Sequence, residues 1–108
     1  MLRTKSQRAK LCKDCPEARV ADALGDSCSL LVMRDLLLRP RKFGELEDSL
    51  GGMSPRTLTQ KLAALQKEGL ITKRTYDTHP RYIYSLTKKG AAFQKVVDAM
   101  RAYGKRHL

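Results

Sequence analysis

Residues 43–70 read FGELEDSLGGMSPRTLTQKLAALQKEGL, and the first half of this stretch predicts a short helix that ends at a glycine pair. Phe43, Leu46 and Leu50 recur at i, i+3 and i+7, so they form one apolar stripe of a helix. Gly51-Gly52 predicts the end of that helix, because glycine adopts the left-handed geometry of a helix exit at little cost.

The second half of the stretch predicts a capped helix. Ser54 is a favourable N-cap, and Pro55 suits the first helical position, where no amide donor is needed. Its apolar face consists of leucines spaced four and three apart, at Leu58, Leu62 and Leu65. Gly69 predicts its end. Two helices joined by a short glycine-containing turn indicate a helix-turn-helix.

The face of this second helix opposite the leucines is the candidate DNA-reading surface. Arginine can bind guanine, glutamine can bind adenine, and an alanine methyl can contact thymine, while threonines can contact phosphates. The candidate DNA contacts on this helix are Ser54, Arg56, Thr57, Thr59, Gln60, Ala63 and Lys67. The competing interpretation is an ordinary solvated face of mixed polar residues.

The charge balance favours an anionic partner. The 108 residues contain 22 Lys and Arg against 11 Asp and Glu, which gives a formal charge of +11. Nucleic acid or an anionic membrane surface fits such a charge. No apolar run approaches the roughly 20 residues of a membrane span, and the N-terminus lacks the apolar core of a signal peptide. We therefore expect one domain, a cytoplasmic, nucleoid-associated location, double-stranded DNA as partner and no membrane association.

The residues before the helix-turn-helix predict an arm and two helices. Residues 1–14 form a basic arm, either solvated or in contact with phosphates, and the domain proper spans 15–108. Pro16 predicts the start of a helix over 16–24. Residues 28–38 are mostly apolar and predict a central buried helix with Arg34 and Asp35 as its polar edge. We expect residues 39–42 to be a basic connector.

The residues after the helix-turn-helix predict a β-hairpin. Residues 71–76 and 81–86 are strand-like, and residues 77–80 form the turn between them, with His79 exposed at the tip. Such a hairpin is a wing, and its basic residues are placed to reach a minor groove or phosphates. These residues are Lys73, Arg74 and Arg81.

The C-terminal segment predicts one long helix, 88–107, capped by Thr87. Its apolar stripe packs either against its own domain or against a second copy. Because the domain is small, we expect a two-fold dimer interface built from this stripe and the helix over 16–24. The predicted interface residues are Val20, Leu24, Phe93, Val96, Val97, Met100 and Tyr103.

Cys12 and Cys15 form a C-x-x-C. A zinc site needs about four ligands and no second pair follows, so we expect no metal and no cofactor. Cys15 at a helix N-terminus, near Lys10 and Lys13, has two features that lower a thiol pKa. It is a candidate sensor of a small-molecule electrophile or oxidant, with Cys12 as a resolving thiol; an unreactive surface thiol is the alternative. We expect Cys28 to fill core space.

Several of these segments resemble the HxlR-type winged-helix regulators. The matching segments are Cys15-Pro16, Arg34-Asp35, residues 41–46 (RKFGEL), residues 53–59 (MSPRTLT), and residues 84–87 (YSLT) before Gly90. The resemblance implies a homodimeric transcription factor that binds inverted-repeat operators. In some members the cysteine before the proline, here Cys15, senses electrophiles or oxidants. Cys28 stands where the family usually has tryptophan, and Ile83 replaces its usual acidic residue.

Together these patterns predict a mainly α protein with a small β-wing, a winged helix-turn-helix flanked by N- and C-terminal dimerisation helices. No nucleophile–base pair, phosphate-binding glycine loop or metal cluster is recognisable, so we do not expect an enzyme. The alternative is a basic RNA-binding or ribosome-associated protein, which also explains the charge. A thiol-disulfide protein that works without nucleic acid is a third hypothesis.

Overall fold

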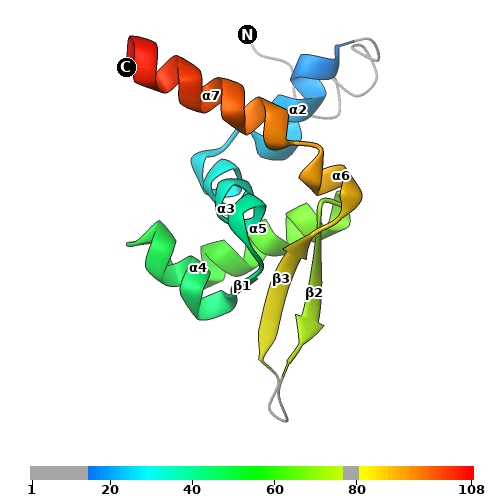
Figure 1. Ribbon diagram of the computed structural model, residues 1–108. Helices are drawn as coiled ribbons and strands as arrows, with labels where there is room; N and C mark the ends of the chain where they lie inside the picture. Colours follow the sequence, from blue (N-terminus) through cyan, green and yellow to red (C-terminus); the bar gives the residue numbers. More distant parts are fainter. Residues whose placement is uncertain (1–14, 77–80) are drawn as a thin grey trace, which may run out of the picture.

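The computed structural model describes residues 15–76 and 81–108. The predicted arm with Cys12, and the wing turn with His79, lie outside the described residues. In chain order the elements are α2 (Pro16–Leu24), α3 (Ser27–Leu38), β1 (Arg41–Lys42), α4 (Phe43–Leu50), α5 (Pro55–Lys67), β2 (Ile71–Thr75), β3 (Tyr82–Leu86), α6 (Lys88–Ala91) and α7 (Gln94–His107). Figure 1 shows α2 and α7 above, α3 in the centre with α4 and α5 below it, and the hairpin projecting downward. The predicted mainly α fold with a small β-wing is confirmed.

The core surrounds α3, as the apolar run over 28–38 predicts. Val32 and Met33 are completely buried, and the α5 leucines pack into the same cluster. One prediction for this helix is wrong, because Asp35 is 4% exposed and does not lie on a polar edge. None of the described helices is both long enough and apolar enough to cross a membrane.

The sheet has three antiparallel strands in the order β1-β3-β2. Residues 39–42, predicted as a basic connector, include the two-residue strand β1, which pairs Arg41 with Tyr84 and Lys42 with Ile83. Two residues carry no alternating pattern of their own, so only the pairing partner identifies them as a strand. The hairpin β2–β3 is confirmed, with Lys73 opposite Tyr84.

The junction between the wing and the C-terminal helices is tightly bonded. The Thr87 hydroxyl donates to the Gly69 carbonyl at 2.6 Å and accepts from the Gly90 amide at 3.1 Å. A Cβ on Gly90 would lie 2.1 Å from the Leu70 carbonyl oxygen, so only glycine allows this approach. The junction therefore fixes α6 against the end of α5.

The predicted single helix over 88–107 is wrong in one respect, because it is divided into α6 and α7. Thr87 caps α6, and the chain turns at Ala92 and Phe93 before α7 begins at Gln94. The Phe93 amide bonds to the Gly90 carbonyl at 3.0 Å, a tighter turn than an α-helix makes. The turn buries the Phe93 ring in the core, where it is 8% exposed.

Candidate nucleic-acid interface

The turn of the helix-turn-helix has the predicted geometry. Gly51 and Gly52 have φ angles of 34° and 80°, in the region that favours glycine. The Ser54 hydroxyl oxygen accepts from the Thr57 amide at 3.1 Å and donates to the Thr57 hydroxyl at 2.9 Å. The Ser54 hydroxyl therefore caps α5 and also bonds to the Thr57 hydroxyl, so a phosphate contact by either group would be additional to these bonds.

The predicted reading face of α5 is solvent-exposed. Every candidate from Ser54 to Lys67 is exposed, whereas Leu58, Leu62 and Leu65 are each 1% exposed. The small side chain of Ala63 lies between the longer side chains of Arg56, Gln60 and Lys67 on this face. The helix therefore presents a guanidinium, an amide and an ammonium around the short side chain of an alanine. Such a surface can enter a DNA groove.

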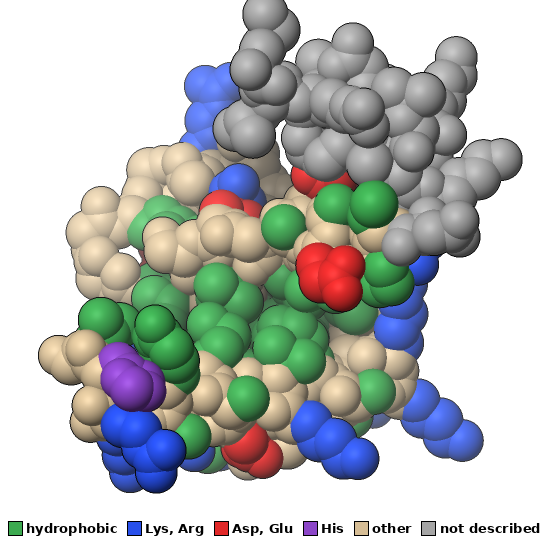
Figure 2. All heavy atoms as spheres, turned by 90° about the horizontal axis from the view of Figure 1, so that it is seen from above, with side chains coloured by type: hydrophobic (Ala, Val, Ile, Leu, Met, Phe, Trp, Pro, Cys, Tyr) green, Lys and Arg blue, Asp and Glu red, His purple; other side chains and the backbone are tan. Residues whose placement is uncertain are grey.

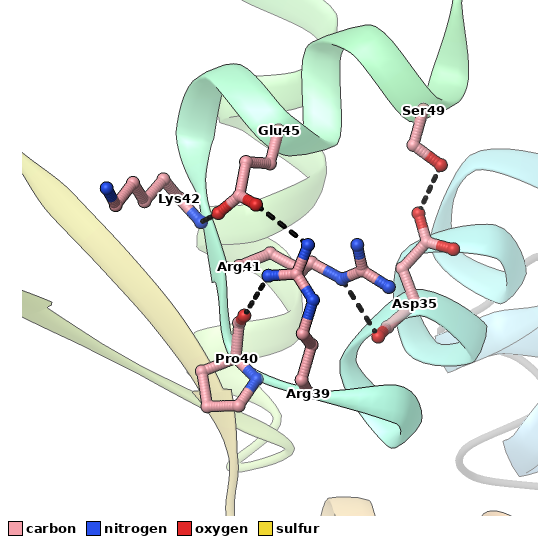
Figure 3. A network of polar contacts seen from close by, with 7 residues as sticks. All are labelled: Asp35, Arg39, Pro40, Arg41, Lys42, Glu45 and Ser49. Atoms are coloured by element: carbon pink, nitrogen blue, oxygen red, sulfur yellow. Dashed lines mark hydrogen bonds and ion pairs between the residues drawn. The ribbon is translucent and has the colours of Figure 1, made fainter.

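A polar network fixes α4 relative to α3 (Figure 3). The Glu45 carboxylate accepts from the Lys42 amide at 2.9 Å and from the Arg39 guanidinium at 2.9 Å. These bonds hold the pKa of Glu45 below its usual range, the Lys42 amide contributing most. The first turn of α4 is thereby attached to the connector that precedes it.

The second part of the network is the buried carboxylate of Asp35. It accepts from the Ser49 hydroxyl at 2.5 Å and pairs with Arg34 at 3.1 Å, while Arg41 donates to the Asp35 carbonyl at 3.2 Å. These contacts join α3, β1 and α4, as Figure 3 shows. The sequence pattern missed this network, because it placed Asp35 on an exposed edge and gave Ser49 no partner.

The wing presents basic residues beside tyrosines. Lys73, Arg74 and Arg81 are exposed as predicted. The Lys73 ammonium lies 3.9 Å from the centre of the Tyr82 ring, and the Lys42 ammonium lies 5.0 Å from that of Tyr76. Both are cation–π contacts, which hold the side chains near the wing without neutralising their charge. Lys42 is thus a fourth basic candidate, which the sequence pattern missed.

The upper face carries the predicted dimer residues, in two groups. Leu24, Phe93 and Val97 are 4%, 8% and 8% exposed, because they pack into the core of a single copy. The sequence pattern placed these three in a dimer interface, whereas the structure buries them in the core of the single chain.

The other four predicted interface residues remain on the surface, with a fifth that was not predicted. The exposed fractions are 45% for Val20, 41% for Val96, 46% for Met100, 62% for Tyr103 and 37% for Leu31. Figure 2 shows hydrophobic side chains gathered in the middle of this face, with Lys and Arg toward its edges. An open groove of about 520 Å³ lies on the same side, between α2 and the α6–α7 turn.

The two described cysteines differ in environment. Cys15 is half-buried at the N-cap of α2, where its carbonyl accepts from the Ala18 amide at 3.1 Å. Cys28 is 4% exposed, as predicted, and its thiol donates to the Met53 sulfur at 3.2 Å. Burial raises the pKa of Cys28, and nearby Asp26 adds to the effect. Within 15–76 and 81–108, no group of three His, Cys, Asp or Glu side chains could hold a metal ion.

Comparisons with known proteins identify the family of the chain. The model of the HxlR-like helix-turn-helix family matches residues 23–108. The HTH-type transcriptional regulator sll1512 of Synechocystis sp. is 41% identical over 91 residues, which are 83% of this chain and 67% of that protein. The regulator YodB of Bacillus subtilis is 29% identical over 91 residues, 82% of this chain and 81% of its own.

Solved structures share the fold over most of the chain. Reduced YodB superposes with a TM-score of 0.73 at 27% identity, covering 86% of this chain and 93% of its own. YodB has also been solved with quinone bound. A protein of Porphyromonas gingivalis assigned to the MarR family of transcriptional regulators superposes with a TM-score of 0.81 at 26% identity, covering 100% and 99%.

Proposed function

The chain belongs to the HxlR-like helix-turn-helix family of transcriptional regulators, and from this premise we propose that it binds inverted-repeat operators as a homodimer. As a regulator of this family it binds DNA. The observation that carries the proposal is the α5 face, where Arg56, Gln60, Ala63 and Lys67 are exposed opposite three buried leucines. In the proposal Arg56 and Gln60 contact base edges in the major groove.

The wing and the first turn of α4 supply phosphate contacts. Lys73, Arg74 and Arg81 lie on the hairpin beside α5, and Lys42 lies at the start of α4. Their charges, within a chain of formal charge +11, favour a polyanion through release of its counterions. These contacts strengthen binding to any duplex, so sequence preference comes from α5.

The dimer uses the exposed apolar residues of the upper face. Val96, Met100 and Tyr103 are spaced four and three apart on α7, so they form one stripe, and Val20 of α2 lies on the same side. A two-fold axis through this face leaves both α5 helices free to meet successive turns of one duplex. The buried residues Leu24, Phe93 and Val97 support the stripe from below.

The proposed signal is an oxidant or electrophile that reacts with Cys15. Its thiol belongs to the N-cap residue of α2, where the helix dipole favours the thiolate. The similar regulator YodB has been solved in reduced and quinone-bound forms. Because α2 carries part of the proposed dimer surface, a bulky adduct at Cys15 changes the spacing of the two α5 helices.

The test is selection of bound sequences from random duplex DNA, followed by competition against a structured RNA at stated salt. We expect an inverted repeat with half-sites about one helical turn apart, or a multiple of that. We also expect the selected duplex to outcompete the RNA. Recovery of single half-sites would contradict the homodimer, and stronger competition by the RNA would favour the RNA-binding alternative.

A further inference from the structure

The recognition helix α5 is held at both ends by other elements. At its C-terminal end, Lys89 donates to the Glu68 carbonyl at 2.6 Å and Thr87 donates to the Gly69 carbonyl at 2.6 Å. At its N-terminal end, Cys28 of α3 contacts Met53, the residue just before the Ser54 cap. Both attachments lie away from the exposed reading face.

A third attachment joins the middle of α5 to the same first turn of α3. The Lys61 ammonium lies 3.6 Å from the Asp26 carboxylate, and both side chains are 38% exposed. Lys61 lies on the flank of α5, between the leucine face and the reading face. The N-terminal end of α3 therefore contacts α5 itself through Asp26 and the residue just before the α5 cap through Cys28.

Asp26 is rigidly placed for this role. It is the N-cap of α3, and its carboxylate accepts from the Ser29 amide at 3.0 Å. Burial acts to raise the pKa of Asp26, but the bonds from Ser29 and the Lys61 charge outweigh it and lower the pKa. The carboxylate is thus charged at neutral pH and points at Lys61 from a fixed helix end.

We propose that Lys61 is a positioning residue for operator binding, which holds α5 against the first turn of α3 through Asp26 and does not itself contact DNA. The inference rests on the proposed role of α5 as the reading helix. A lysine on such a helix would ordinarily be assigned to a phosphate. The two roles predict opposite effects for loss of the Asp26 charge, and this difference allows a clean test.

The test measures operator affinity for Asp26→Asn, Lys61→Gln and the double variant over a series of salt concentrations. Asparagine is also a good N-cap, so Asp26→Asn removes the charge and keeps the cap. We expect each single variant to bind about two- to fivefold more weakly per subunit, the range of a partly exposed ion pair. The double variant should lose no more than either single one.

Lys67→Gln is the matched control, because Lys67 lies on the exposed reading face of the same helix. Loss of the Lys67 charge should make the log-log slope of operator affinity against salt shallower by about 0.9 per subunit. Lys61→Gln should leave that slope unchanged. Lys61→Arg keeps the pair and should bind like the unaltered protein. Thermal unfolding of each variant shows that binding is measured on folded protein.

Three outcomes would overturn the inference. Tighter binding by Asp26→Asn, with a shallower salt slope for Lys61→Gln, would make Lys61 a phosphate contact. Additive losses in the double variant would mean that the two side chains do not act together. Unchanged affinity in all three variants would remove any positioning role. If Lys67→Gln also has no effect on the slope, Lys67 does not contact a phosphate; failure to select an operator sequence would instead refute the role of α5, which is a separate result.

Discussion

Two glutamines on α5 allow a test of whether this helix reads bases, because one lies on the proposed reading face and the other does not. Gln60 lies on the face opposite the buried leucines, whereas Gln66 is exposed on a flank of the same helix. We expect Gln60→Ala, like Arg56→Ala, to weaken the free energy of binding to the selected operator by about 1–3 kcal/mol and to change binding to random duplex little. Gln66→Ala should leave both affinities unchanged. Equal losses on operator and random duplex would show that Gln60 does not read bases.

Individual residues also show which features could be predicted from the sequence and which could not. Ser54, Pro55 and the glycine pair were predictable because capping and left-handed geometry are local effects. Asp35 was not, because its burial depends on Ser49 of α4 approaching it in the folded chain. The exposure of the α5 face that carries Gln60 could be predicted because the buried leucines define its opposite side.

At the scale of elements, the junction at Gly90 gives a stability prediction with an internal control. Gly90→Ala places a Cβ 2.1 Å from the Leu70 carbonyl oxygen, so we expect overpacking to lower the free energy of unfolding by about 1–3 kcal/mol. The Cβ added by Gly104→Ala meets nothing within 4 Å and lies inside α7, so this variant should raise the free energy of unfolding by about 0.5–1 kcal/mol. Urea unfolding measures both. A neutral Gly90→Ala would mean that α6 is not held closely against Leu70.

The elements that sequence reasoning missed carry no local sequence signal of their own. β1 is too short to show a pattern, and the break between α6 and α7 falls where no proline or glycine marks it. Phe93 and Val97 were predicted in the dimer interface, because an apolar stripe shows that a helix face is buried but not against which neighbour. The longer elements, from α2 to the wing hairpin, carry their own caps and periodicity and were predicted.

Substitutions in the exposed apolar stripe on α7 test whether the chain forms the proposed dimer. Val96→Glu combined with Met100→Glu places two carboxylates on the exposed stripe, and we expect monomers in sedimentation at micromolar concentration, together with weaker operator binding. Gln94→Glu adds a carboxylate on the opposite side of α7 and should leave the dimer intact. An unaltered protein that sediments as a monomer would contradict the dimer directly.

At the scale of the whole molecule, the charge of +11 predicts strongly salt-dependent binding. If each subunit places several lysines and arginines on phosphates, the log-log slope of affinity against salt should be several units, near −0.9 per contact. Arg74→Ala or Arg81→Ala should weaken operator and random duplex about equally and make the slope shallower. A flat salt response would rule out binding through phosphates.

The last prediction concerns how the proposed dimer responds to an oxidant. Cys28 is buried with a raised pKa, so its thiol is protonated at neutral pH and should react slowly with diamide or a quinone. Cys15 begins α2, which contributes Val20 to the proposed dimer surface. A modification there should rotate one subunit against the other, and a small rotation is enough to misplace two helices that must fit one duplex face.

We therefore expect oxidant or quinone to lower the operator affinity of the unaltered protein and of Cys28→Ala, but not that of Cys15→Ser. Cys12→Ser separates two kinds of product, because loss of the response to diamide but not to a quinone would identify Cys12 as the resolving thiol. Mass spectrometry of the treated protein places the modification. If Cys15→Ser responds like the unaltered protein, the signal enters elsewhere, and the DNA-binding role of α5 stands independently of that result.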